Sequence, residues 1–300
     1  MNPRAIDVRY LGVDQAAWAF LVEGPEGHAL VECGPAASWP HLVRGLAEAG
    51  LTPEAVGALF LTHIHLDHGG ATGHLCAHGA KVFVHPFGAP HLVDPARLVA
   101  SSRRVHGAAY DRFYGDLRPV APDRVRAVAE GEVVQAAGLR WTAIHTPGHA
   151  RHHIAWLLEL EGDLHAFVGD LAGIRVPESD FLLMPTPPPE FDPEAWATSL
   201  HRVMRAAPTH LWLTHGGLVA RDRGEAERFL QRAVEELGRE TGELRRLTAG
   251  VEGAVGIEVR RLRARAIAEG VPPRRIDQFI DEGFARMNLA GAERAFQPRP

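Results

Sequence analysis

The sequence has only two cysteines, a single lysine and no long apolar run in 300 residues. Cys33 and Cys76 cannot form a disulfide scaffold, so we expect a protein of the reducing cytoplasm. No stretch approaches the roughly 20 apolar residues that span a bilayer, and the charged N-terminus lacks a secretory signal. A formal net charge of −5 gives no sign of a polyanionic partner. These absences predict no membrane and no nucleic-acid partner. They favour a small-molecule substrate and leave a homodimer open.

Short apolar segments separated by turn residues predict a body rich in strands. The expected strands are residues 5–11, 16–22, 29–33, 56–61, 81–84, 125–128, 132–135, 139–144, 154–160, 165–168 and 211–213, the last clear strand. The expected helices are residues 42–49, 71–78 and 193–206, and the proline-rich residues 177–189 are expected to form a loop. From residue 225 the pattern becomes that of amphipathic helices, with two or three more after the first. We therefore place a soft boundary between a body, residues 1–220, and a helical region, residues 221–300.

The densest chemical pattern follows the expected strand 56–61, where four metal-ligand side chains fall within six positions: His63, His65, Asp67 and His68. His63 and His65 alternate, so both can point the same way from the end of a strand. Asp67 and His68 come after the backbone bends, so their side chains can point toward a second metal position near the first. Imidazole and carboxylate together suit zinc, or iron and manganese. One short loop can therefore furnish two adjacent metal positions.

Three later candidates, His149, Asp170 and His215, each follow an expected strand and adjoin a glycine. Loops fixed by strand ends often carry active-site ligands. A single histidine at a strand end is usually an ordinary hydrogen-bonded residue. Burying all of these imidazoles and carboxylates together without a cation would be costly, however. The combination therefore predicts a metal centre, although spacing alone does not assign each ligand to an ion.

With these residues in this order, the sequence resembles the metallo-β-lactamase fold superfamily, on its glyoxalase II-like branch, over roughly residues 5–220. The resemblance implies an α/β fold, an αββα sandwich of two mixed β-sheets flanked by helices, followed here by a small helical C-terminal region. It implies two divalent metal ions, zinc ahead of iron or manganese. The implied ligands are His63, His65 and His149 for the first ion, Asp67, His68 and His215 for the second, and Asp170 as the bridge.

The same resemblance implies a function, a hydrolase that uses a metal-bridging hydroxide on a small ester, thioester or lactone. Asp67 would also be catalytic, because it can orient the nucleophile or carry a proton. One alternative is a mononuclear iron persulfide dioxygenase, which would use only His63, His149 and Asp170. A second alternative is a non-catalytic metal-binding protein.

Other residues carry open interpretations. Glu32 begins a Glu-Cys-Gly segment where many relatives have Asp-Thr-Gly, and it either stands behind the ligands or faces solvent. Thr62, Thr146 and Thr214 lie close before ligand candidates and either orient them or simply end strands.

Two further segments are distinctive. Residues 85–114 follow the metal loop and its next strand and are rich in aromatic rings and histidine. They are the first candidate for a pocket wall, although a structural role in the core is the more common one for such residues. The four arginines in residues 260–265 are interpreted as the solvated face of a helix.

Overall fold

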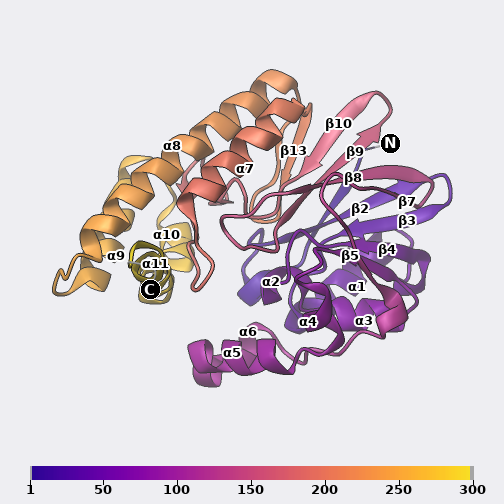
Figure 1. Cartoon of the computed structure of the whole chain (residues 1–300), viewed down its shortest axis with the longest axis horizontal. Coiled ribbons are helices and arrows are strands. Elements are labelled where there is room, and N and C mark those ends of the chain that lie inside the picture. The colour runs from indigo at the N-terminus through magenta and orange to yellow at the C-terminus, as the bar shows by residue number, and fades with distance from the viewer. Residues whose placement is uncertain (1, 298–300) are drawn as a thin grey trace.

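In the computed structural model, which describes residues 2–297, two six-stranded β-sheets lie face to face (Figure 1). The first sheet has the order β1-β2-β3-β4-β5-β6, and its strands are β1 (Arg4–Asp7), β2 (Trp18–Gly24), β3 (Gly27–Val31), β4 (Val56–Phe60), β5 (Lys81–Val84) and β6 (Val125–Ala127). The second has the order β14-β13-β10-β9-β8-β7, with β7 (Val133–Ala136), β8 (Leu139–His145), β9 (Ile154–Leu160), β10 (Asp163–Phe167), β13 (His210–Leu213) and β14 (Gly217–Ala220). Both sheets contain parallel and antiparallel pairs, so both are mixed.

Aromatic side chains from both sheets fill the space between them. Phe60 on β4 stacks on Trp141 of β8 with ring centroids 4.1 Å apart, and its edge-on contact with Trp156 of β9 measures 4.9 Å. All three rings are fully buried. Each buried aromatic removes a large apolar area from water, so this layer fixes the two sheets against each other.

Helices cover the outer face of each sheet, which confirms the predicted αββα sandwich. The first sheet packs against α1 (Trp39–Glu48) and α3 (Thr72–Ala77), and the second against α7 (Pro193–Ala206) and α8 (Arg223–Leu247) (Figure 1). The remaining helices are α2 (Leu66–Gly69), α4 (Ala89–Val93), α5 (Ala96–His106), α6 (Tyr110–Phe113), α9 (Ala254–Ala268), α10 (Pro273–Phe279) and α11 (Glu282–Phe296). None of the helices in residues 2–297 has the length and apolar character needed to cross a bilayer.

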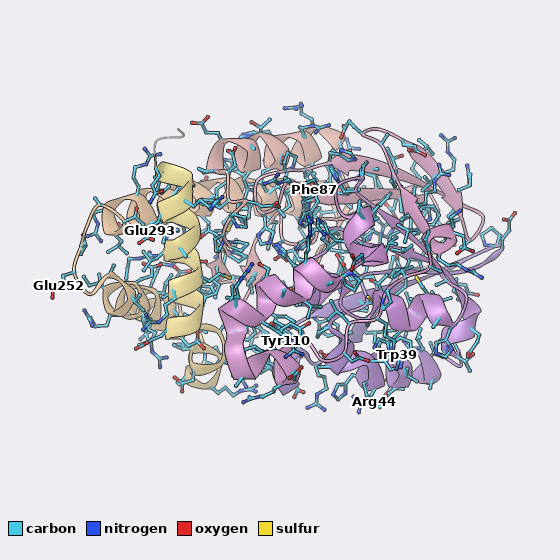
Figure 2. The ribbon with its side chains drawn as sticks, turned by 60° about the horizontal axis from the view of Figure 1, so that its bottom comes forward. Trp39, Arg44, Phe87, Tyr110, Glu252 and Glu293 are labelled. Carbon is cyan, nitrogen blue, oxygen red and sulfur yellow. The ribbon has the colours of Figure 1, made fainter. Side chains whose placement is uncertain are left out.

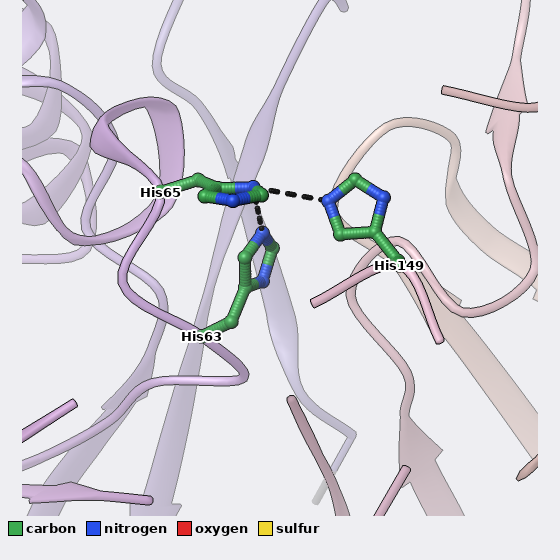
Figure 3. Close-up of side chains that lie close together, drawn as sticks. All are labelled: His63, His65 and His149. Carbon is green, nitrogen blue, oxygen red and sulfur yellow. Dashed lines mark hydrogen bonds between the residues drawn. The ribbon is translucent and has the colours of Figure 1, made fainter. Parts of the chain in front are cut away.

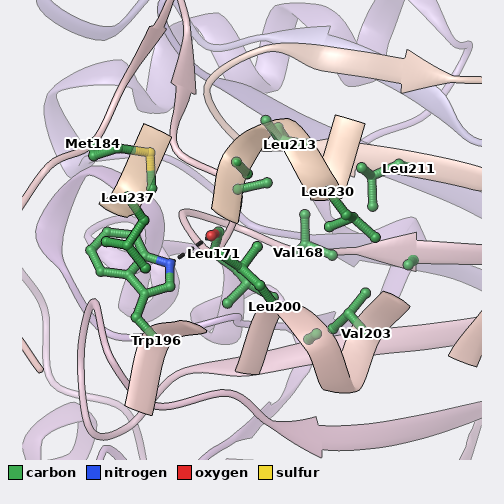
Figure 4. Packing of buried hydrophobic residues seen from close by; sticks show 14 of the residues in the cluster. Val168, Leu171, Met184, Trp196, Leu200, Val203, Leu211, Leu213, Leu230 and Leu237 are labelled. Atoms are coloured by element: carbon green, nitrogen blue, oxygen red, sulfur yellow. Dashed lines mark hydrogen bonds between the residues drawn. The ribbon is translucent and has the colours of Figure 1, made fainter. Parts of the chain in front are cut away.

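The packing beneath α7 and α8 also fixes a loop that carries a ligand candidate. The Asp192 side chain accepts a hydrogen bond from the Ala195 amide and so caps α7, which begins at a proline. One turn on, Trp196 is buried in a cluster with Leu200 and other apolar residues (Figure 4). Its indole N–H donates to the carbonyl of Leu171 at 2.6 Å. The helix is thereby tied to the residue that follows Asp170.

Several predicted boundaries differ from the structure. The first expected strand ends at Asp7, because the backbone turns through a short 3-10 helix at Tyr10–Gly12. The proline-rich stretch expected to be a loop contains β12 (Leu182–Leu183), which pairs with β11 (Ile174–Arg175). A further strand, β14, follows the strand expected to be the last. All three depend on contacts with distant residues that local composition does not encode.

The interpretation of residues 260–265 as a solvated face is wrong for two of the arginines. Arg261 and Arg265 keep only 19% and 13% of their side chains exposed. Arg261 pairs with Glu258 of its own helix at 2.8 Å and with Glu240 of α8. Arg265 pairs with Glu240 at 2.6 Å and with Glu236 at 3.2 Å. Buried carboxylates need such partners to offset their desolvation. The pairs with Glu236 and Glu240 join α9 to α8, while α8 itself contacts α7 and β14. The division of the chain near residue 221 stays a prediction.

Candidate metal centre

All seven predicted ligand side chains lie at one edge of the sandwich, each on a loop or turn that leaves a strand. His63 follows β4, His65 directly precedes α2, and Asp67 and His68 lie within α2. Among the later candidates, His149 follows β8, Asp170 follows β10, and His215 lies between β13 and β14. Because β10 and β13 are parallel neighbours, their carboxyl ends meet at the same edge of the sheet.

Three histidines form the first group, drawn in Figure 3. The Nδ1 atom of His65 lies 3.0 Å from Nε2 of His63 and 3.0 Å from Nε2 of His149. Two ligand atoms about 2.0–2.1 Å from a tetrahedral zinc ion would lie roughly 3.3 Å apart. The three ring nitrogens therefore converge as ligands of one ion do.

The second group consists of Asp67, His68 and His215, and Asp170 lies between the two groups. Nε2 of His215 is 3.4 Å from Oδ2 of Asp67, and Nε2 of His68 is 3.9 Å from the same oxygen. Asp170 presents Oδ1 to His68 at 3.2 Å and to His215 at 3.6 Å, while its Oδ2 faces His149 at 3.4 Å. One carboxylate thus turns one oxygen to each group.

Several buried polar atoms at this edge lack hydrogen-bond partners among residues 2–297. They include both ring nitrogens of His68 and Oδ1 of Asp170. A buried polar atom without a partner costs about 1–3 kcal/mol, and more when it is charged. Divalent cations satisfy such nitrogen and oxygen atoms directly. The donor set therefore fits the ions that the family resemblance implies.

Backbone carbonyls orient two of the histidines. Nδ1 of His149 donates to the carbonyl of Pro185 at 3.0 Å, and Nδ1 of His215 donates to the carbonyl of Ala16 at 2.6 Å. Since a carbonyl can only accept, each ring must carry its proton on Nδ1. The lone pair on Nε2 is then directed into the site, as metal ligation requires.

Glu32 stands behind the ligands, which settles the two interpretations left open by its position in the sequence. It is fully buried, with φ at 62°, and its Oε1 accepts hydrogen bonds from the Thr62 hydroxyl and, at 3.3 Å, from the Thr62 amide. The same oxygen lies 3.4 Å from Nδ1 of His68 and 3.4 Å from the Thr214 hydroxyl. The Thr62 hydroxyl is also 3.0 Å from Nδ1 of His63. Glu32 thus supports ligand candidates from both groups.

The charges at the site oppose the effect of burial. Burial alone would lower the pKa of His68, but the carboxylates of Asp170 and Asp67 raise it well above its ordinary value. Burial alone would raise the pKa of Asp170, but the imidazoles of His68 and His215 hold it well below its ordinary value. A divalent ion bound by these side chains would balance the charge of the carboxylates.

The other sequence interpretations have mixed outcomes. Thr146 bonds His153, with its hydroxyl 2.7 Å from Nδ1, and makes no such bond to a ligand candidate. In the expected pocket wall, Phe87 is 42% exposed and stacks on His152 at 6.1 Å. The His152 ring lies 5.6 Å from that of His65, so the beginning of this segment does border the site.

The carbonyls of Pro185 and Ala16, which orient His149 and His215, could not be predicted from the sequence. They are backbone groups, and no residue pattern marks them.

Comparison with known proteins places these features in a family. The family model of the metallo-β-lactamase superfamily matches residues 12–207. A metallo-β-lactamase fold-containing protein of Sulfurisphaera tokodaii, ST1585, is 33% identical over 166 residues, which are 54% of this chain and 61% of that protein. A hydroxyacylglutathione hydrolase of Cupriavidus taiwanensis is 32% identical, over 52% of this chain and 48% of its own length. The thioesterase pkgB of Emericella nidulans is 27% identical, over 54% and 39%.

The crystal structure of ST1585 superposes with a TM-score of 0.60 at 23% identity, covering 79% of this chain and 94% of that one, which shows a shared fold. The chain spans about half the length of the curated relatives it matches. The family model, by contrast, covers more than half of this chain and includes six of the seven converging side chains. The chain belongs to the metallo-β-lactamase superfamily.

Proposed function

We propose that the chain is a metal-dependent hydrolase with two divalent metal ions, acting on a small ester, thioester or lactone. The observation that carries the proposal is the placement of Asp170, whose two carboxylate oxygens face two different ligand groups. A protein that held a single ion would have no need for the second group. The hydrolase and thioesterase names of two relatives support the same reaction class.

In this proposal, His63, His65 and His149 would hold one ion, Asp67, His68 and His215 would hold the other, and Asp170 would contribute to both. When bound, divalent ions supply Lewis acidity and allow a water to ionise near neutral pH. The side chains contribute position and proton transfer.

Asp67 is the proposed catalytic carboxylate. Its side chain is 22% exposed, whereas that of Asp170 is 5% exposed. Asp67 can therefore accept a proton on the side that faces the substrate, while Asp170 stays enclosed. A general base must lie within hydrogen-bonding reach of the proton that it takes, and a ligand at the open side of the site meets that condition.

The test has two parts, both on protein purified without chelators. Elemental analysis should find about two zinc ions per chain, and the same preparation should hydrolyse members of a panel of thioesters, esters and lactones, with phosphodiesters as a negative control. One ferrous ion per chain, with oxygen consumption on persulfides, would favour the dioxygenase instead. Bound metal with no turnover of any kind would favour a non-catalytic role.

A further inference from the structure

The turn between β1 and β2, residues 9–15, has an unusual backbone. Arg9, Leu11 and Gln15 all have positive φ angles, of 50°, 57° and 65°, although none of them is glycine. Each such conformation is strained and persists only where the surroundings impose it. Three in one short turn indicate that the turn holds a side chain in a required place.

Side chains from three elements impose this conformation. Asp7 accepts hydrogen bonds from the Arg9 amide at 2.9 Å and from the Gln15 amide at 2.8 Å. Arg9 pairs with Asp14 at 2.6 Å. From α10, the buried Arg275 donates to the carbonyl of Asp14 at 2.9 Å. The turn is therefore fixed to the sheet on one side and to the C-terminal helices on the other.

The residue that the turn presents is Tyr10. Its ring stacks on that of Tyr114 with centroids 6.3 Å apart, and it packs against a buried cluster that contains Leu66. Leu66 immediately precedes Asp67. The carboxylates of Asp67 and Asp170 act on the Tyr10 phenol, whose pKa is raised well above its ordinary value by burial, by Tyr114 and by these charges. Tyr10 therefore packs against the segment that carries Asp67.

Three polar groups, the hydroxyls of Tyr10 and Tyr114 and the ring of His106, form a row. The Tyr10 hydroxyl lies 3.3 Å from the Tyr114 hydroxyl, which lies 3.2 Å from Nε2 of His106 on α5. We call these three side chains the hydroxyl row. Within residues 2–297 their side-chain hydrogen bonds are only to one another. Tyr110, which is labelled in Figure 2, has a buried hydroxyl with no hydrogen-bond partner among residues 2–297 and is not part of the row.

The hydroxyl row is uncharged and has one direction. The Tyr10 hydroxyl donates to the Tyr114 oxygen, so the Tyr114 hydroxyl is free to donate to Nε2 of His106. Burial lowers the pKa of His106, which favours the neutral ring that accepts this bond. The Tyr10 oxygen is then left to accept a further hydrogen bond. Such an end suits a hydroxyl donor and not a carboxylate.

We propose that Tyr10 accepts a hydrogen bond from a hydroxyl on the acyl part of the substrate, and thereby selects hydroxylated acyl groups over plain hydrocarbon ones. This inference rests on the proposed function. It makes Tyr10 a specificity-determining residue, with Tyr114 and His106 holding its hydroxyl in place.

The test compares 3-hydroxybutyryl and butyryl groups, each offered as an N-acetylcysteamine thioester and as an ester, on the metal-loaded full chain. The wild type should prefer the hydroxybutyryl substrates. Tyr10→Phe should lower kcat/KM on these by about 2- to 10-fold, the range of one neutral hydrogen bond, mainly through KM. Its kcat/KM on the butyryl substrates and its metal content should stay those of the wild type.

Tyr110→Phe is the matched control, because it removes a nearby phenolic hydroxyl that has no partner, and it should change neither substrate. If Tyr10→Phe does not fold, Tyr114→Phe interrupts the hydroxyl row one position further out and gives the same comparison. An equal loss of kcat/KM on the hydroxybutyryl and butyryl substrates, or no loss on either, would overturn the inference. Turnover by the wild type would in that case still support the proposed function. Failure of the wild type to hydrolyse any ester, thioester or lactone would overturn both.

Discussion

Gly148, the residue before His149, has no room for a side chain. Its φ is 141°, and an added Cβ would stand 2.3 Å from both Cα and Cβ of Trp196. The atoms in the way belong to the backbone and base of a buried side chain, so they cannot rotate aside. Trp196 is also held by its indole bond to the Leu171 carbonyl. We therefore expect Gly148→Ala to force α7 and the His149 loop apart.

The magnitude follows from two effects. The backbone conformation costs a residue other than glycine about 1–3 kcal/mol, and overpacking of a tight contact costs about 1–3 kcal/mol more. The sum, about 2–6 kcal/mol, lowers Tm by at least about 4 °C in a chain of this size. Displacement of His149 should also lower the zinc retained after dialysis. Calorimetry and elemental analysis measure the two effects separately.

The control is the same substitution where space is open. Gly238 and Gly242 lie inside α8, and an added Cβ would meet nothing within 4 Å at either position. Gly238→Ala and Gly242→Ala should each raise stability by about 0.5–1 kcal/mol, because alanine loses less backbone entropy in a helix. The reasoning is refuted if Gly148→Ala keeps the Tm and the zinc content of the wild type.

The other predictions concern the ligand set and the C-terminal helices. His65→Ala should remove bound metal and activity together, because Nδ1 of His65 faces both partners of its group; full metal content by elemental analysis would contradict this. Asp170→Asn should weaken retention of at least one ion, and an unchanged stoichiometry would count against a bridging role. Glu32→Gln keeps the shape but removes a buried charge, so chelator competition should show affinity about 10- to 100-fold weaker, and equal competition curves would exclude such a role. Deleting the residues after Arg221 exposes the apolar face under α8, so we expect aggregation in size-exclusion chromatography, and a soluble, equally active truncation would refute that.

The parts of the fold that the sequence predicted well are those encoded by local pattern. The apolar run before His63 became β4, and the glycine-flanked candidates His149 and Asp170 came after strands as expected. In each case strand propensity and burial agree over several residues, so local and tertiary preferences coincide. The family resemblance then supplied the arrangement of the layers, which no local pattern carries.

The errors occurred where a distant contact decides the local structure. Tyr10 was predicted to lie in a strand, because the local pattern of apolar residues favours an extended backbone. In the structure it lies in a turn, which is fixed by hydrogen bonds with the side chains of Asp7 and Arg275. Arg261 and Arg265 were predicted to lie on a solvated face because charged residues are usually exposed. They are enclosed because they pair with a glutamate on the neighbouring helix α8. In both cases the partner lies in another element of the fold, where no window along the sequence can find it.

The proposed centre also depends on backbone hydrogen bonds between the two halves of the sandwich. The Ile154 amide, from the second sheet, donates to the carbonyl of Thr62 at 2.7 Å, and the Trp18 amide, from the first, donates to the carbonyl of Thr214 at 2.9 Å. Each bond joins a loop that carries ligand candidates to a strand of the opposite sheet. The ligands of one ion therefore cannot separate unless the sheets do. Metal affinity at this edge and the stability of the whole sandwich are, by this geometry, one coupled equilibrium.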